Sequence, residues 1–319
     1  MKYGILSTAS IAGRFIAGVR ESGLDEVCAI ASRSSQKAED FAARENIPTA
    51  YGNYQQLFED EDLDIIYIPT VNVNHYRDGC QALEHGKHVV MEKPFTLTSA
   101  DAEELFKLAE EKNCFLMEGQ KAVFLPVSED LKDLLQKQEI GELRYIDFKM
   151  SHTNHPLDHW MYQPAMGGGA LYGSGSYIIE YLLYLLDDPK LQISGCCQRA
   201  ASGTDTIASF NLKTDKDILI NATIATNIEF DSEVVFYGTK GNITVQNFWK
   251  ADRLSINYND GTSQQHCFPQ KSEFAFEARH IHECLEKGLL QSPRMNAQRT
   301  IECVRLVEQL QKQWKENEE

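Results

Sequence analysis

The chain has 319 residues, of which 42% are hydrophobic and 24% charged, and its 31 basic against 47 acidic residues give a formal net charge of −16. That length suits two domains better than one, and the acidic balance disfavours nucleic acid and anionic membranes, because both bind basic faces. No apolar run is long enough to span a membrane, and the apolar start of the chain is too short for a signal peptide. Eight cysteines without a C-x-x-C pair favour small buried side chains in a reducing cytoplasm.

Alternating strands and helices are predicted for residues 1–119. Short apolar runs favour strands at 3–6, 26–31, 64–69, 89–91 and 115–117, and amphipathic segments favour helices at 34–44, 75–84 and 98–112. A further helix is expected after the first strand, with Ser10 as its N-cap. This alternation specifies parallel βαβ units and a doubly wound sheet.

The run Val89–Met91 ends at Glu92-Lys93-Pro94, because proline cannot continue a central strand. In an open parallel sheet, ligands bind beyond the carboxyl ends of the strands. Lys93 is therefore expected where a fixed cation meets a bound molecule, although an ordinary surface lysine after a strand would show the same pattern.

The first βα turn is where a dinucleotide pyrophosphate is expected, but the small residues of a G-x-G-x-x-G/A turn are here Ser7, Ala9 and Ala12. A plain βα turn would also explain this pattern. The N-terminus of the following helix still presents free N–H groups and the positive end of its dipole, which suit an anion.

The second strand ends in Ala31-Ser32-Arg33 and lacks the Asp or Glu that usually binds the ribose 2′-hydroxyl of NAD. Arg33 is able to contact a 2′-phosphate through two hydrogen bonds and to stack on adenine, while Ser32 and Lys37 supply further donors. We therefore predict NADP rather than NAD, with a solvated charge at the helix start as the alternative for Arg33.

Several short motifs, in their order and spacing, resemble the Gfo/Idh/MocA (glucose–fructose oxidoreductase / inositol dehydrogenase) family of NAD(P)-dependent oxidoreductases. The motifs cover nearly the whole chain: Gly4–Ala9, Ala31–Arg33, Tyr67–Thr70 with Asn72 and His75, Glu92–Pro94, Met117–Glu118, and Gly167–Leu171 followed by Gly175 and Tyr177. The resemblance implies an NAD(P)-binding Rossmann domain over residues 1–119. It implies a domain for substrate binding and oligomerisation over residues 120–319.

The resemblance also implies roles for residues around Lys93. The lysine of the family's E-K-P motif lies beside the nicotinamide and the reacting carbon, which assigns that position to Lys93, and Glu92 is expected to contact the cofactor end of the site. A cis Lys93–Pro94 bond is also considered. The residues expected to bind cofactor elsewhere are Ser7, Thr8, Ala9, Ser10 and Ile11 in the first turn and Pro69, Thr70, Asn72 and His75 near the nicotinamide. A role at the helix start is the alternative for His75.

Residues 120–319 predict an α+β domain with a large, mostly antiparallel, open sheet and helices on one face. Helices are expected at 120–138, interrupted at Pro126, and at 174–186, 274–287 and 297–314; strands are expected at 143–152, 191–199, 206–212, 218–226, 233–237, 242–245 and 253–257. The family resemblance implies that the open face of the sheet forms the interface of a homodimer or a larger homo-oligomer.

A glycine run, Gly167–Gly169, precedes the helix that carries Tyr177. In the family this segment leads to an Asp and, four residues later, to a His or Tyr; here Tyr177 has the second position and Gly173 replaces the Asp. Tyr177 is expected to exchange a proton with the substrate oxygen, beside the Lys93 cation. A buried aromatic side chain on an amphipathic helix is the alternative for Tyr177.

The loop of residues 152–160 contains three histidines, Asp158 and Trp160. Its spacing matches no strong zinc pattern, and Pro156 prevents a regular helix, so no metal site is predicted. Sugar or polyol binding is favoured instead. Trp160 or Tyr162 would cover an apolar ring face, and His155 and Asp158 would form hydrogen bonds with hydroxyl groups.

These patterns together predict an NADP-dependent oxidoreductase that moves hydride between nicotinamide and a CH–OH or C=O carbon of a small-molecule sugar, polyol or related cyclic alcohol. Lys93 would position and polarise the oxygen, and Tyr177 would handle the proton. Two alternatives stay open: a redox-cofactor-dependent glycoside hydrolase, and a non-catalytic NADP-binding sensor.

Overall fold

The computed structural model describes residues 1–153, 156 and 158–316, which form two compact units. The first unit contains Met1–Lys121 and Lys271–Ile301; the second contains Ala122–Gln270 and the segment from Glu302 onward. The chain therefore divides differently from the predicted 1–119 and 120–319, because one C-terminal segment returns to the first unit.

The returning segment carries the helix α8 (Phe274–Glu286), which packs on α1 (Ser10–Ser22). The rings of Phe15 and Phe274 meet edge to face with centroids 6.0 Å apart. A Cβ added to Gly18 would lie only 2.4 Å from the Cβ of Phe274, so glycine permits the close approach of the two helices. Tertiary packing of α8, which no local pattern reports, sets the domain division.

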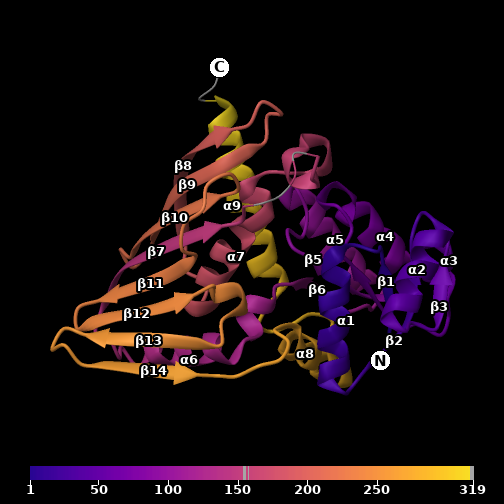
Figure 1. The fold of residues 1–319 in the computed structure, drawn as a ribbon, viewed down its shortest axis with the longest axis horizontal. Helices are drawn as coiled ribbons and strands as arrows, with labels where there is room; N and C mark the ends of the chain where they lie inside the picture. Colours follow the sequence, from indigo (N-terminus) through magenta and orange to yellow (C-terminus); the bar gives the residue numbers. More distant parts are fainter. Residues whose placement is uncertain (154–155, 157, 317–319) are drawn as a thin grey trace. The chain divides into compact units, whose positions relative to one another are not determined.

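The first unit is built on a six-stranded sheet in the order β3-β2-β1-β4-β5-β6 (Figure 1). Its strands are β1 (Lys2–Leu6), β2 (Glu26–Ala31), β3 (Thr49–Tyr51), β4 (Ile65–Ile68), β5 (His88–Glu92) and β6 (Leu116–Gly119). All neighbouring strands are parallel. This is the strand order of a dinucleotide-binding Rossmann sheet, and it confirms the predicted doubly wound architecture.

Helices α2 (Ser35–Glu45), α3 (Tyr54–Glu59), α4 (His75–Glu84) and α5 (Ser99–Glu111) join these strands. Ser34 and Thr98 cap α2 and α5 through their side chains, as helix-start residues commonly do. The predicted cap at Ser10 is wrong, because Ser10 is the first helical residue and Ala9 precedes it without a side-chain bond. The short β3 and α3 were not predicted.

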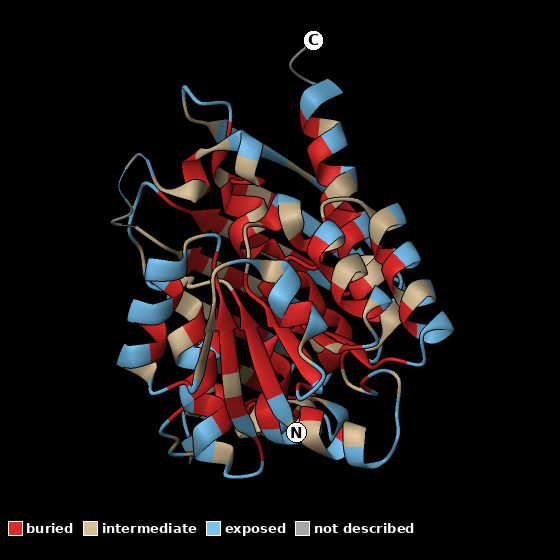
Figure 2. Cartoon of the chain, turned by 90° about the vertical axis from the view of Figure 1, so that its right-hand side faces the viewer, coloured by how far each residue is buried: buried red, intermediate tan, exposed pale blue. Residues whose placement is uncertain are grey.

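The core of the first unit is the sheet itself, whose strands Figure 2 colours mostly as buried, between helices with exposed outer faces. All four residues of β4 are buried, as expected for a strand covered on both faces. The ring of Tyr67 in β4 stacks on Phe15 of α1 with centroids 3.7 Å apart. This contact joins the first helix to the middle of the sheet.

The second unit contains an eight-stranded sheet in the order β14-β13-β12-β11-β7-β10-β9-β8. Its strands are β7 (Leu143–Ser151), β8 (Leu191–Arg199), β9 (Asp205–Thr214), β10 (Leu219–Ala225), β11 (Glu233–Gly238), β12 (Gly241–Gln246), β13 (Arg253–Tyr258) and β14 (Ser263–Cys267). Neighbours are antiparallel except for β7 and β10. The predicted, mostly antiparallel sheet is confirmed, with β14 added.

The remaining α-helices of the described residues are α6 (Pro126–Gln136), α7 (Ala170–Leu185) and α9 (Ala297–Glu316). Pro126 does not interrupt a helix; it begins α6, where a missing N–H costs nothing. On β7, Ile146, Phe148 and Met150 are fully buried, and the alternate Tyr145 is exposed. One face of the sheet thus packs and the other faces outward.

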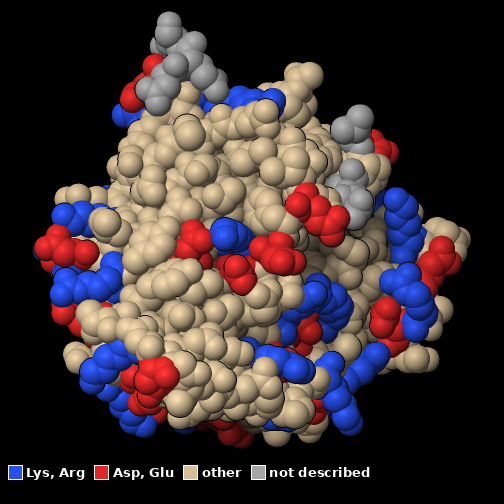
Figure 3. All heavy atoms as spheres, turned by 60° about the vertical axis from the view of Figure 1, so that its left-hand side comes forward, with Lys and Arg blue, Asp and Glu red and all other residues tan. Residues whose placement is uncertain are grey.

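No helix among the described residues is long and apolar enough to cross a membrane. On the face drawn in Figure 3, charged side chains of both signs stand in small groups, without a continuous basic surface.

Candidate active site

The carboxyl edge of the Rossmann sheet carries Lys93, which directly follows β5 and is half-buried. The Lys93–Pro94 peptide bond is cis, as considered from the sequence. Beside β5, the register pairs Glu92 with Gly119 of β6, so the chain segments after both strands leave the sheet next to each other. Lys93 therefore lies where parallel sheets bind ligands.

Glu92 has a defined partner inside the first unit. Its carboxylate accepts a hydrogen bond of 2.5 Å from the hydroxyl of Tyr67, and the pair is buried. Because Tyr67 is itself held against Phe15, the backbone just before Lys93 is anchored to the sheet interior.

His75 is fully buried and joins the loop after β4 to the segment after β5 that contains Lys93. Its Nδ1 lies 2.8 Å from the carbonyl oxygen of Pro94, and its Nε2 lies 2.9 Å from that of Thr70. Burial lowers the pKa of His75, while the two carbonyl contacts act in the opposite direction. The ring thus holds loop positions, with Asn72 nearly buried and Pro69 buried close by in the same loop.

The turn after β1 has a backbone conformation typical of glycine, although none of its residues is a glycine. Ser7 has φ 118°, a conformation that side chains rarely adopt, and its N–H donates to the Ala31 carbonyl at 3.0 Å. The residues from Ser7 to Ile11 are all at least partly exposed. No side chain caps the first turn of α1, so its N–H groups suit the pyrophosphate of a dinucleotide.

A cavity of about 440 Å³ lies beside Arg33. Its lining residues are Arg33, Tyr54, Gln55, Phe58, Asn74, Arg77, Asp78 and Gln81. Burial and the Asp78 carboxylate raise the pKa of Tyr54, whereas Arg33 and the Ser7 side chain act in the opposite direction. Arg33 and the first turn thus lie close to residues that the sequence analysis did not single out. Those on α3 were missed because that helix carries no recognisable motif.

Lys37 and Ser32 lie near the same strand end. Lys37 is exposed on α2 and its backbone N–H is bound by Ser34, whereas Ser32 is nearly buried and accepts a weak bond from the Ser34 N–H at 3.4 Å. The residues around Arg33 fit the 2′-phosphate end of a dinucleotide, since they combine cations with hydrogen-bond donors.

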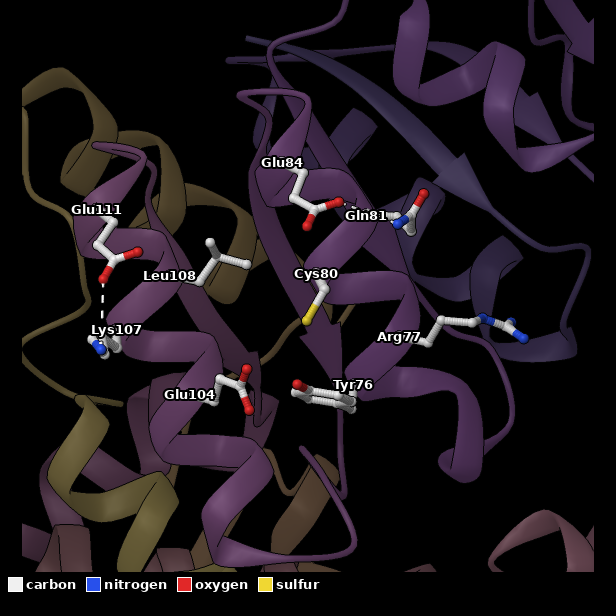
Figure 4. A pocket seen from close by; sticks show the side chains of 9 residues that line it. All are labelled: Tyr76, Arg77, Cys80, Gln81, Glu84, Glu104, Lys107, Leu108 and Glu111. Carbon is white, nitrogen blue, oxygen red and sulfur yellow. Dashed lines mark hydrogen bonds and ion pairs between the residues drawn. The ribbon is translucent and has the colours of Figure 1, made fainter.

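A second cavity, of about 390 Å³, lies between α4 and α5 (Figure 4). Interaction with the Glu104 carboxylate raises the pKa of Tyr76, and burial raises the pKa of Cys80. Arg77 points away from Cys80 and Glu104 in Figure 4. No residue that the sequence analysis expected to bind cofactor or substrate lines this cavity, although Arg77 and Gln81 line both it and the cavity beside Arg33.

In the second unit, Asp205 fixes the start of the helix that carries Tyr177. Its carboxylate accepts a 2.7 Å hydrogen bond from the Leu171 N–H. A Cβ added to Gly169, at φ 130°, would lie 2.1 Å from Asp205 Oδ1, so only glycine fits there. Burial raises the pKa of Asp205. Asp205 was missed because it lies 28 positions after Tyr177 in the chain and belongs to no recognisable motif.

Tyr177 lies in an aromatic group of the second unit and is 7% exposed. Its ring centroid is 6.4 Å from that of Trp249, which lies 5.1 Å from the ring of His152. A Cβ added to Gly173 would meet only the Met161 methyl group, at 3.4 Å. Trp249 was missed because it follows β12, far from the glycine run.

The loop residues expected to bind substrate have different surroundings. Trp160 is half-buried and Asp158 exposed, whereas the Tyr162 hydroxyl is buried and donates to the Thr226 carbonyl at 2.9 Å. His155 lies outside the described residues. Within residues 1–153, 156 and 158–316, no three His, Cys, Asp or Glu side chains are grouped to hold a metal ion.

A Rossmann sheet with a lysine at its carboxyl edge and a first turn that suits a pyrophosphate has the architecture of a dinucleotide-binding protein. Residues 1–120 match the family model for the oxidoreductase family with an NAD-binding Rossmann fold, and residues 129–244 match the GFO/IDH/MocA C-terminal domain. The chain is 30% identical over 307 residues to trans-1,2-dihydrobenzene-1,2-diol dehydrogenase of Xenopus laevis, with 92% of each chain covered. The chain belongs to the Gfo/Idh/MocA family.

Solved structures agree with this fold. KijD10, a 3-ketoreductase from Actinomadura kijaniata in complex with NADP and TDP-benzene, is similar with a TM-score of 0.90 and 26% identity, with 98% of each chain covered. The aldose-aldose oxidoreductase from Caulobacter crescentus, complexed with glycerol, has a TM-score of 0.89 and 22% identity, with 99% of this chain and 98% of that chain covered.

Proposed function

We propose that this protein is an NADP-dependent oxidoreductase that transfers hydride between nicotinamide and a CH–OH or C=O carbon of a sugar, polyol or related cyclic alcohol. The observation that carries the proposal is the half-buried Lys93 at the carboxyl edge of β5, between the anchored Glu92 and the loop that His75 holds. When NADP is bound, its nicotinamide supplies or accepts the hydride.

Lys93 binds and polarises the substrate oxygen in this mechanism. A fixed ammonium stabilises the negative charge that develops on oxygen during hydride transfer, and it needs no reorganisation when its backbone is already held in place. The Tyr67–Glu92 bond and the His75 contacts supply that rigidity.

Tyr177 exchanges the proton with the same oxygen. A phenol donates or accepts a proton at fixed geometry, and Asp205 holds the helix that presents it. Gly173 stands at the position where the family resemblance implies an Asp, so in this proposal the chain relies on the tyrosine without that carboxylate. The open sheet face is the proposed interface of a homo-oligomer.

The aromatic group around Tyr177 favours a cyclic substrate. Trp249 and His152 combine an apolar ring face with a hydrogen-bonding group, the pairing that sugar and cyclic-diol rings require. The names of the curated relatives, which refer to a cyclic diol, support the same substrate class.

A panel of cyclic diols, sugars and polyols with NADP⁺, followed by NADPH absorbance, tests the function. We expect turnover on at least one cyclic alcohol and a loss of about 10²-fold or more in kcat for Tyr177→Phe, the usual size of a general acid–base contribution. Tyr172→Phe on the same helix is the control. Sugar release without net NADPH formation would favour the glycoside hydrolase instead, and unchanged turnover in Tyr177→Phe would remove the tyrosine from the mechanism.

A further inference from the structure

Glu118 in β6 is a fully buried carboxylate beside β5, and the mechanism above does not use it. All four residues of β6 are buried. A charge in such a place costs free energy unless hydrogen bonds compensate for it, and an apolar side chain would avoid that cost. The presence of a glutamate at this position therefore requires an explanation.

The sheet register shows what Glu118 holds. Strands β5 and β6 pair as far as Glu92 and Gly119, where the ladder ends. Beyond that point the chain leaves the sheet, so its peptide groups need other partners. The Oε1 atom of Glu118 accepts a hydrogen bond of 3.0 Å from the Phe95 N–H. The side chain of Glu118 thus continues the pairing of the two strands by one further hydrogen bond.

His75 lies on the other side of the same peptide group. Its Nδ1 is 2.8 Å from the Pro94 carbonyl oxygen, and this carbonyl forms one peptide group with the Phe95 N–H. The side chains of His75 and Glu118 are both fully buried, which strengthens their polar contacts. Two buried side chains, one from α4 and one from β6, therefore fix the peptide plane that follows Pro94.

The side chain of Phe95 adds a third anchor to this segment. It is fully buried, and its ring stacks on that of Phe106 in α5 with centroids 5.1 Å apart. On the other side of Lys93, the carboxylate of Glu92 is bound by the Tyr67 hydroxyl. The backbone of the half-buried Lys93 is thus held from both directions along the chain.

We propose that Glu118 is a positioning residue for Lys93: by holding the Phe95 N–H opposite His75, it sets where the Lys93 ammonium stands at the carboxyl edge of the sheet. This inference rests on the proposed function, in which that ammonium polarises the substrate oxygen. A fixed charge stabilises a transition state only when it stands in the right place beforehand, and a displacement of about 1 Å costs about 10²-fold in rate. The length and the acceptor oxygen of Glu118 matter in this role, rather than its charge.

Two conservative substitutions separate the hydrogen bond from the charge. Glu118→Gln keeps the length and an acceptor oxygen but removes the charge, whereas Glu118→Asp keeps the charge and withdraws the oxygens by one methylene group. We expect Glu118→Gln to retain kcat within about threefold. We expect Glu118→Asp to lower kcat by about 10- to 100-fold, while KM and the Kd for NADP change by about threefold or less.

Hydrogen exchange of the Phe95 amide, followed by NMR in the whole protein, measures the contact without turnover. The Phe95 N–H should exchange at least about 10-fold faster in Glu118→Asp and near the native rate in Glu118→Gln, because its protection depends on the acceptor. If Glu118→Asp does not fold, Glu118→Met, which is similar in size and lacks the oxygen, takes its place with the same expected results.

Asp25→Asn is the matched control. The Asp25 side chain is also fully buried, but it precedes β2 at the opposite, amino edge of the sheet, where its Oδ1 lies 2.9 Å from His282 Nδ1. This variant should unfold at a lower temperature and keep the native kcat and Phe95 exchange rate. An equal loss of kcat in Asp25→Asn would reveal a general effect of replacing a buried carboxylate and would overturn the proposal.

Native kcat or native Phe95 exchange in a folded Glu118→Asp variant would also overturn the proposal. So would a Glu118→Gln variant as impaired as Glu118→Asp, because the charge would then matter more than the hydrogen bond. The expected exchange rates in a protein that oxidises no alcohol would uphold the hold of Glu118 on the Phe95 N–H and contradict only the proposed function.

Discussion

At the scale of single residues, the candidate site depends on polar side chains whose partners are fixed by the fold. Glu92, His75 and Asp205 each form a short contact that holds a loop or a helix start. Arg33 differs from them, because it lines a cavity and remains available for a ligand. Predictions for Arg33 therefore concern binding, and those for His75 concern stability.

Arg33→Ala should weaken NADP binding by about 10- to 100-fold, the range of one or two charge-assisted hydrogen bonds, and should leave NAD binding nearly unchanged. Isothermal titration calorimetry with both cofactors measures this difference. Arg44→Ala is the control, because Arg44 lies on the neighbouring helix α2 and stacks on Phe41. Tighter binding of NAD than of NADP, with Arg33→Ala neutral, would contradict the cofactor assignment.

His75 should make stability depend on pH. Burial lowers its pKa in the folded protein, so its stabilising contribution is present above the unfolded value of about 6.5 and is lost as the pH falls below it. The thermal unfolding midpoint of the unsubstituted protein should therefore drop between about pH 7 and pH 5, and His75→Gln should drop less. Equal slopes in both proteins would contradict this role, and His85→Gln, at the end of α4, is the control.

At the scale of elements, α7 and its N-cap contain one position that requires glycine, Gly169, and one that does not, Gly173. Gly169→Ala should destabilise the protein by about 2 kcal/mol or more, because its φ is positive and Asp205 fills the space. Gly173→Ala should be neutral or stabilise by up to about 1 kcal/mol, since alanine favours helix and only a flexible methionine is near. Thermal unfolding of both variants gives the comparison, and an equal effect at both positions would refute it.

Most strands and helices could be predicted because hydrophobic periodicity and caps are local signals. β2 and α4 have the predicted bounds, and the β5 strand ends at the proline motif as expected. Two strands were not predicted because their local signal is weak. Strand β3 is only three residues long, and β14 has few apolar side chains to alternate with polar ones. Pro126 was misinterpreted because proline suits a helix start as well as a helix break.

At the scale of the whole molecule, the division into units could not be predicted. Helix α8 belongs with α1 because of Phe274, Gly18 and the Arg14–Glu273 pair, which are more than 250 residues apart along the chain. Packing between distant segments of the second unit explains why Asp205 was missed. It lies next to the start of α7 only after folding and belongs to no local motif, whereas Lys93 was predicted because a strand, a proline and a family motif coincide.

The account depends on Lys93 acting on the reacting oxygen, and the most direct measurement is turnover of Lys93→Met beside its affinity for NADP. We expect kcat to fall by about 10²- to 10³-fold, the usual loss when a fixed charge-stabilising group is removed, while the Kd for NADP changes by about threefold or less. Lys107→Met should retain both values. Unchanged turnover in a folded, NADP-binding Lys93→Met protein would contradict the account.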